Sequence, residues 1–202
     1  MNQAELIQDI VRHLDDAGLP YMITGSVASG RYGEVRATFD TDIVVDAKWP
    51  DLRAFVLSFG HDYYADEQMA RDAWARRSMF NIIHSASGQK VDIICRKDRD
   101  YDRVAFERRR KERALGIDVF LVSPEDSILS KLEWSRKGAS ERQYRDALGV
   151  AKAQGAALDL AYLARWADEL RVVDLLDQLL RDSDLTDDKT PVTPDFPDGH
   201  YR

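Results

Sequence analysis

Two aspartates open an apolar strand in the first quarter of the chain. Asp40 and Asp42 lie on the predicted strand 39–46, which continues as an apolar run. Residues two positions apart on a strand project from the same face, with Cα atoms about 6.6 Å apart. Two acids at the mouth of a buried strand cost desolvation and mutual repulsion, and a divalent metal ion offsets both. The pair therefore predicts a metal site, and the alternative is an acidic pair that faces solvent.

A glycine–serine turn and a third acid extend this prediction. Gly25 and Ser26 lie between an apolar strand and the short helix 26–32. Glycine lets the backbone approach a ligand and a helix start offers unpaired N–H groups, an arrangement that binds phosphate. Asp92 interrupts the apolar strand 90–95. The alternatives are an ordinary turn and a single acid satisfied at a strand end.

Combined, these parts describe one kind of chemistry. Three carboxylates on adjacent strands can hold two Mg²⁺ ions through oxygen ligands. A phosphate-binding turn beside them would position a nucleoside triphosphate, and two metal ions clamp the attacking and leaving oxygens of an in-line displacement. The third acid can accept a proton from an incoming hydroxyl. No nucleophilic side chain is needed.

The order and spacing of these parts resemble the DNA polymerase beta-type nucleotidyltransferase superfamily. Gly-Ser, thirteen further residues, Asp-x-Asp in an apolar strand and a later apolar-Asp-apolar strand follow one another. The form GSVASGRYGEVRATFDTDIVV, with Tyr32-Gly33 and Arg-x-Thr-x-Asp ending at Asp40, is closer to the AbiEii-type and minimal nucleotidyltransferases than to the aminoglycoside-modifying ones.

The resemblance implies a fold, an activity and a set of site residues. The implied fold class is α/β (α+β), a mixed sheet with flanking helices followed by a C-terminal helical bundle. The implied activity moves a nucleoside monophosphate from an NTP to a hydroxyl acceptor, with two Mg²⁺ ions, which Mn²⁺ can replace, and release of pyrophosphate. By position, the resemblance assigns nucleotide binding to Gly25 and Ser26, and metal binding and catalysis to Asp40, Asp42 and Asp92.

Further cations are candidates for the triphosphate. Arg31 and Arg36 lie close to the turn, although either could pair with an acid. Lys131 lies one turn inside a well-capped helix, and Asp146 lies in the next helix, stations at which Lys and Asp recur in AbiEii-type proteins. We predict that Arg36 and Lys131 bind the nucleotide. The alternative is a surface lysine, with Asp146 paired to Arg145.

The pattern of the chain predicts the elements that position these residues. Helical spacing and capping signals predict helices over 3–17, 26–32, 50–58, 67–75 and 100–113. Apolar or alternating runs predict strands over 21–24, 39–46, 78–84, 90–95 and 117–122, with 78–95 a hairpin. After Ser123 the chain is predicted to be helical to about residue 182. We therefore predict a nucleotidyltransferase catalytic domain over 1–122, a helical domain over 123–182, and a flexible acidic tail over 183–202.

Composition limits the other possibilities. The chain has 202 residues and a formal net charge of −7, with 44% apolar and 32% charged residues. A polar N-terminus and the lack of a run of about 20 apolar residues predict a cytoplasmic protein that does not associate with membranes. The single cysteine, Cys95, excludes an internal disulfide and a cysteine-based zinc site. We predict that Cys95, Trp134 and Trp166 pack in the core.

The acceptor is left open. Residues 96–113 hold nine basic and five acidic side chains, which could bind RNA, although mixed signs favour a solvated helix face. A tRNA end, a protein side chain and a small molecule are all compatible with the sequence, as is a role in a toxin–antitoxin pair. Two rival functions are a catalytically silent nucleotide-binding or antitoxin-like module and an antibiotic adenylyltransferase. The oligomeric state does not follow from the sequence.

Overall fold

The computed structural model describes residues 1–33, 41–138 and 140–185. Asp40 and Arg36 lie outside this part of the chain, as does nearly all of the predicted tail. Among the described residues, no helix is long and apolar enough to cross a membrane.

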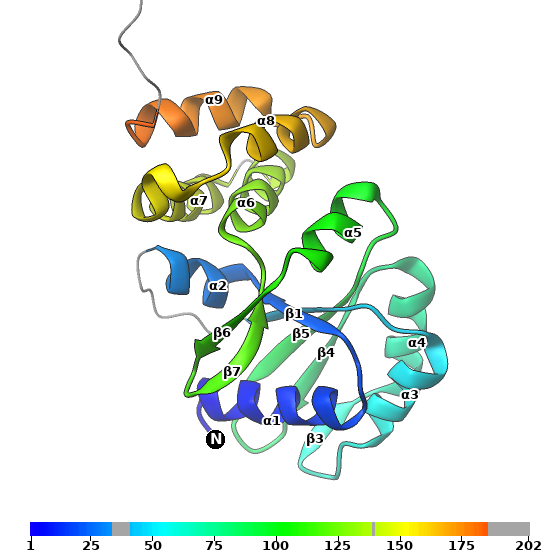
Figure 1. The fold of residues 1–202 in the computed structure, drawn as a ribbon. Helices are drawn as coiled ribbons and strands as arrows, with labels where there is room; N and C mark the ends of the chain where they lie inside the picture. The colour runs from blue at the N-terminus through cyan, green and yellow to red at the C-terminus, as the bar shows by residue number, and fades with distance from the viewer. Residues whose placement is uncertain (34–40, 139, 186–202) are drawn as a thin grey trace, which may run out of the picture.

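A seven-stranded mixed sheet forms the centre of the described structure, in the order β3-β4-β5-β2-β1-β7-β6 (Figure 1). The strands are β1 (Tyr21–Thr24), β2 (Asp42–Val45), β3 (Tyr63–Ala65), β4 (Met79–His84), β5 (Lys90–Cys95), β6 (Arg110–Ala114) and β7 (Ile117–Leu121). The pairs β1–β7 and β2–β5 are parallel and the other neighbours are antiparallel. This arrangement confirms the predicted fold class.

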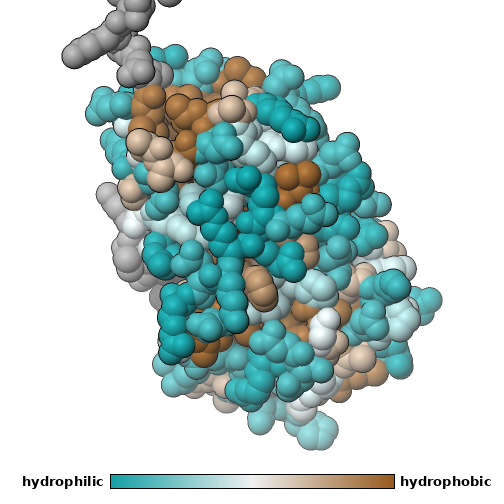
Figure 2. Space-filling view, viewed as in Figure 1, coloured by the Kyte–Doolittle hydropathy of each residue, from teal (hydrophilic) through white to brown (hydrophobic). Residues whose placement is uncertain are grey.

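Nine α-helices flank the sheet or follow it in the described part. They are α1 (Gln3–Asp16), α2 (Gly25–Tyr32), α3 (Trp49–Leu57), α4 (Glu67–Arg76), α5 (Asp100–Glu107), α6 (Pro124–Gly138), α7 (Glu141–Gln154), α8 (Leu160–Glu169) and α9 (Val173–Asp182). Figure 1 shows α6 to α9 stacked at one end of the molecule, with α2 between them and the strands. The face in Figure 2 is largely hydrophilic, with its hydrophobic patches small and separated.

The pleat of β2 decides which side of the sheet carries Asp42. Thr41 directly precedes this strand and is fully buried, and its Oγ1 accepts a hydrogen bond from Gln3 Nε2 of α1 at 2.8 Å. Ile43 and Val45 share its side and are also buried. Because successive side chains alternate between faces, Asp42 projects from the face opposite α1.

The predicted helix over 100–113 is wrong in its second half. The helix α5 ends at Glu107, and residues 110–114 form the edge strand β6, which pairs with β7 from Arg110↔Leu121 to Ala114↔Ile117. Leu115 and Gly116 both have positive φ, at 54° and 80°, as a tight two-residue hairpin turn requires. Pairing with β7 therefore overrides the helical preference of the basic run.

Two further differences concern a strand and a tryptophan. The short strand β3, which pairs with β4, was not predicted and lies just before the helix predicted over 67–75. Trp134 is 58% exposed, so the prediction that it packs in the core is wrong. Trp166 and Cys95 are buried, as predicted. Helix α6 buries charged residues, such as Lys131 and Glu133, as well as apolar ones. Its apolar residues alone therefore do not mark its buried side.

A buried polar cluster joins the start of α6 to the β6 side of the sheet. The Asp126 carboxylate accepts from the hydroxyls of Ser123 and Tyr162, each at 2.7 Å, and pairs with Arg108 Nε at 3.4 Å. Burial raises the pKa of Asp126 despite these bonds. Arg108 also donates to Glu125 at 3.1 Å and stacks over the Tyr162 ring, 3.8 Å from its centroid. These contacts fix α6 relative to the sheet.

A second network ties α5 to the middle of α6. Arg99 bonds both carboxylate oxygens of Glu133, at 2.7 and 3.2 Å, and also pairs with Asp102. Burial alone would raise the pKa of Glu133, but hydrogen bonds from Arg99 and Lys137 lower it to about 2. Glu133 is therefore ionised in the folded protein at neutral pH.

Candidate functional site

Four polar side chains form one row across four neighbouring strands. Thr24 of β1 pairs with Asp42 of β2, Asp42 pairs with Asp92 of β5, and Asp92 pairs with Asn81 of β4. Residues directly opposite one another share a face of the sheet, and neighbouring strands lie about 4.8 Å apart. The structure thus brings together two of the three predicted acids, Asp42 and Asp92, on adjacent parallel strands.

Gly25 lies against the carboxylate of Asp42. A Cβ atom at position 25 would come within 2.1 Å of Asp42 Oδ2 and 3.1 Å of Asp42 Cγ. Gly25 also has a φ of +65°, which side chains rarely adopt. Two separate constraints therefore require glycine at this turn, and the close neighbour is the Asp42 side chain.

The helix that follows the turn presents an uncapped N-terminal end. Thr24 is the N-cap residue of α2 but its side chain makes no capping hydrogen bond, and the first turn contains no acidic residue. N–H groups at a helix start carry partial positive charge and favour anions. The predicted residues Gly25 and Ser26 form this first turn, next to Asp42.

Asp92 is held by two neighbours on the same face of the sheet. Its residue is only 7% exposed. Asn81 Nδ2 donates to Asp92 Oδ1 at 2.5 Å, and Lys90 Nζ lies 3.3 Å from Oδ1 and 3.5 Å from Oδ2. The backbone N–H of Asp92 donates to the carbonyl of Thr41 at 2.8 Å, which holds β5 beside the start of β2.

The two acids suit a hard divalent cation. Carboxylate oxygens are the ligands that Mg²⁺ and Mn²⁺ prefer, and Asp42 and Asp92 offer them from adjacent strands. Among residues 1–33, 41–138 and 140–185, no group of three or more His, Cys, Asp or Glu side chains could hold a metal ion. The third predicted ligand, Asp40, lies outside these ranges.

Lys131 is buried in the contact between α6 and α7. Its Nζ pairs with Asp146 Oδ2 at 3.0 Å and lies 3.3 Å from Gln143 Oε1, and the residue is 5% exposed. The alternative of a surface lysine is therefore wrong, and Asp146 pairs with Lys131 across the two helices. Both α6 and α7 contact α2, which places this pair in the helices that flank the candidate phosphate-binding helix.

Sequence reasoning did not select Asn81 and Lys90. Asn81 is a polar residue inside an otherwise apolar stretch of the predicted strand 78–84, and Lys90 lies two residues before Asp92. Both signals are visible in the sequence, but only the strand register brings Asn81 opposite Asp92.

Arg31 and several basic side chains of the segment 96–113 have acidic partners. Arg31 pairs with Glu112 at 3.2 Å. Within the segment 96–113, ion pairs bind basic side chains to acids on the same or neighbouring elements: Arg96–Asp46, Arg99–Glu133, Arg103–Asp98, Arg108–Glu125 and Arg113–Asp118. This pattern favours a surface of mixed charge over a uniformly basic platform.

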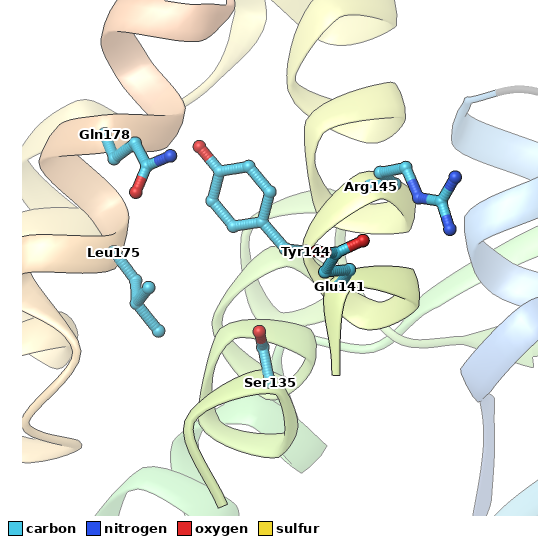
Figure 3. Close-up of a pocket in the computed structure, with 6 residues that line it drawn as sticks. All are labelled: Ser135, Glu141, Tyr144, Arg145, Leu175 and Gln178. Carbon is cyan, nitrogen blue, oxygen red and sulfur yellow. The ribbon is translucent and has the colours of Figure 1, made fainter. Parts of the chain in front are cut away.

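A separate open pocket of about 320 Å³ lies among the C-terminal helices. Figure 3 shows Ser135 of α6, Glu141, Tyr144 and Arg145 of α7, and Leu175 and Gln178 of α9 around it. Tyr144 is anchored there because its hydroxyl donates to Asp182 Oδ2 at 2.7 Å. None of the predicted site residues lines this pocket.

Comparisons with known proteins identify the fold. No protein-family model and no curated protein sequence matches the chain. The solution structure of the antibiotic-resistance factor ANT(2'')-Ia matches with a TM-score of 0.58 and 14% identity, covering 87% of this chain and 97% of that one. The crystal structure of ANT(2'')-Ia in complex with adenylyl-2''-tobramycin matches with a TM-score of 0.52 and 17% identity, covering 88% and 99%.

A third solved structure matches over a similar share of the chain. An antigenic nucleotidyltransferase-like protein from Paracoccidioides brasiliensis matches with a TM-score of 0.51 and 18% identity, covering 87% of this chain and 91% of that one. At such identities the likeness concerns the fold. The chain therefore has the nucleotidyltransferase fold over most of its length, and the closer resemblance to AbiEii-type proteins stays a prediction.

Proposed function

We propose that this protein is a metal-dependent nucleotidyltransferase that moves a nucleoside monophosphate from an NTP to a hydroxyl acceptor. The observation that carries the proposal is the placement of Asp42 and Asp92 on adjacent strands, in register, with Gly25 against the Asp42 carboxylate. A nucleotidyltransferase fold could house many functions, but these residues are the ones that the chemistry requires.

Each residue has a defined role in this proposal. Asp42, Asp92 and the predicted third ligand Asp40 hold Mg²⁺ or Mn²⁺. When bound, the metal supplies positive charge that offsets the charge of the phosphates during in-line displacement. Gly25 and Ser26 bind the terminal phosphates through the N-terminal end of α2.

The bond changes follow from these roles. The acceptor hydroxyl oxygen bonds to the α-phosphorus, the bond between that phosphorus and the bridging oxygen to the β-phosphate breaks, and pyrophosphate leaves. In this proposal Asp92 accepts the hydroxyl proton. Lys131, held by Asp146, and Arg36 add positive charge toward the triphosphate, and the helical half 123–182 forms one wall of the cleft.

The presence of both acids in register argues against a catalytically silent module, because nucleotide binding alone does not need them. The acceptor remains a choice among RNA, protein and a small molecule. One neighbour was solved with an adenylylated antibiotic, so an aminoglycoside belongs among the acceptors to be tested, together with tRNA and the protein partner of a toxin–antitoxin pair.

Variants of the two acids test the proposal. Wild type, Asp42→Ala and Asp92→Ala are incubated with Mg²⁺, each labelled NTP and a whole-cell extract, and transferred label is measured. We expect label on one acceptor fraction with wild type and none with either variant, while thermal unfolding stays cooperative. Asp118→Ala is the matched control, because Asp118 is a half-exposed acid on β7. Full transfer by both site variants would overturn the assigned site.

A further inference from the structure

Asn81 lies beside Asp92 on the neighbouring antiparallel strand. Its Nδ2 donates to Asp92 Oδ1 at 2.5 Å, within the row of polar residues that crosses the sheet. Hydrogen bonds to an ionised acceptor are shorter and stronger than neutral ones. This bond therefore holds one named oxygen of the carboxylate.

Lys90 contacts the same carboxylate in a different way. Its ammonium lies 3.3 Å from Oδ1 and 3.5 Å from Oδ2, so it attracts both oxygens almost equally. A compact ammonium on a flexible stem offers charge with little directional preference. Lys90 thus offsets the charge of Asp92, whereas the amide of Asn81 distinguishes between its two oxygens.

The rotation of a carboxylate about its terminal bond is broad. An acid that must both hold a metal ion and receive a proton needs that rotation fixed, since catalytic groups work only within a narrow range of orientations. The partners that hydrogen-bond a ligating carboxylate supply such orientation in metal sites.

We propose that Asn81 is a positioning residue: its amide fixes the Asp92 carboxylate through Oδ1 and presents Oδ2 to the divalent cation and the acceptor. This inference rests on the proposed function, because it assigns Asn81 a role in the same site. Lys90 acts as a counter-ion to the same acid and does not orient it.

Binding of Mn²⁺ to the full chain, measured by calorimetry without nucleotide, tests the inference apart from activity. We expect Asn81→Ala and the near-isosteric Asn81→Leu to weaken Mn²⁺ binding by about 10- to 100-fold. In transfer assays the same variants should lose kcat, with KM for the NTP little changed. Lys90→Met, which removes a competing cation, should bind Mn²⁺ at least as tightly as wild type.

The matched control is Asn2→Ala. Asn2 caps α1 through its side chain, so its loss destabilises the fold from outside the row of polar residues on β1, β2, β5 and β4. If Asn2→Ala weakens Mn²⁺ binding as much as Asn81→Ala, the effect is one of stability and the inference is wrong. Wild-type affinity in both Asn81 variants, with binding lost in Asp92→Ala, would also overturn it. If Asp92→Ala binds Mn²⁺ like wild type, the proposed function itself fails.

Discussion

Replacement of Gly25 by alanine tests the central contact of the site. The new Cβ would lie 2.1 Å from Asp42 Oδ2, well inside van der Waals contact. Because the Asp42 contact is the end of a flexible side chain, the carboxylate of Asp42 would give way before the backbone of the turn between β1 and α2. To reach an ordinary contact distance, that carboxylate must move by roughly 1 Å or more, and misplacement on this scale costs on the order of 100-fold in rate.

The substitution also strains the backbone. Gly25 has φ of +65°, and a non-glycine residue in the left-handed region costs about 1–2 kcal/mol. For a chain of this size, 1 kcal/mol shifts the thermal midpoint by about 2–4 °C. We therefore expect Gly25→Ala to lower the midpoint by about 2–8 °C and to remain folded.

Gly18 offers a matched control for this strain. Its φ is +62°, and a Cβ atom there would meet nothing within 4 Å. Gly18→Ala should therefore lose a similar amount of stability and keep full function. The assay compares calorimetric binding of Mn²⁺ with NTP and transfer of label for the two variants. Equal binding and transfer by Gly25→Ala and Gly18→Ala would refute the argument that Gly25 protects the position of Asp42.

Two other predictions concern the helical half. Gly33→Ala would place a Cβ 2.9 Å from the backbone of Gly149, and such overpacking costs about 1–3 kcal/mol. Gly30→Ala, within α2 and with nothing within 4 Å, should keep or raise the thermal midpoint in the same melts, because alanine favours a helix more than glycine. Burial would raise the pKa of Glu133, but hydrogen bonds, mainly from Arg99, lower it from 4.5 to about 2. The ionised carboxylate therefore stabilises the folded protein, and this stabilisation is lost in acid. Between pH 4.5 and about 2 the Glu133 carboxyl takes up a proton in the unfolded state but stays ionised in the folded state, so the free energy of unfolding falls as the pH falls. Glu133→Gln should therefore flatten the pH dependence of urea unfolding in that window, and an unchanged slope would contradict the assignment.

The sequence predicted best where one local signal decided the structure. The strands 21–24 and 90–95 were predicted with their observed bounds, because each is a short apolar run limited by glycine or polar residues. The helix start at Ser123 also follows from local chemistry, since the Ser123 hydroxyl accepts from the Asp126 N–H at 3.1 Å. Such features need no knowledge of the rest of the chain.

Features that depend on distant partners were missed. The second half of 100–113 forms β6 because it pairs with β7. The composition of the basic run alone does not predict this pairing. Asn81 acquires its place in the site only through the register of β4 with β5. Lys131 was predicted to bind the nucleotide, but its burial and its pairing with Asp146 across two helices could not be predicted from either helix alone.

The short helix α2 links the candidate site to the helical half of the chain. At its first residue, Gly25 touches the Asp42 carboxylate, and just past its last turn, Gly33 lies against the backbone of α7. Gln154 Nε2 of α7 also donates to the carbonyl of Tyr32 at 2.9 Å, and Tyr32 is buried. Both α6 and α7 contact α2. The helices after residue 123 therefore help to fix the position of α2, and with it the turn that lies against Asp42.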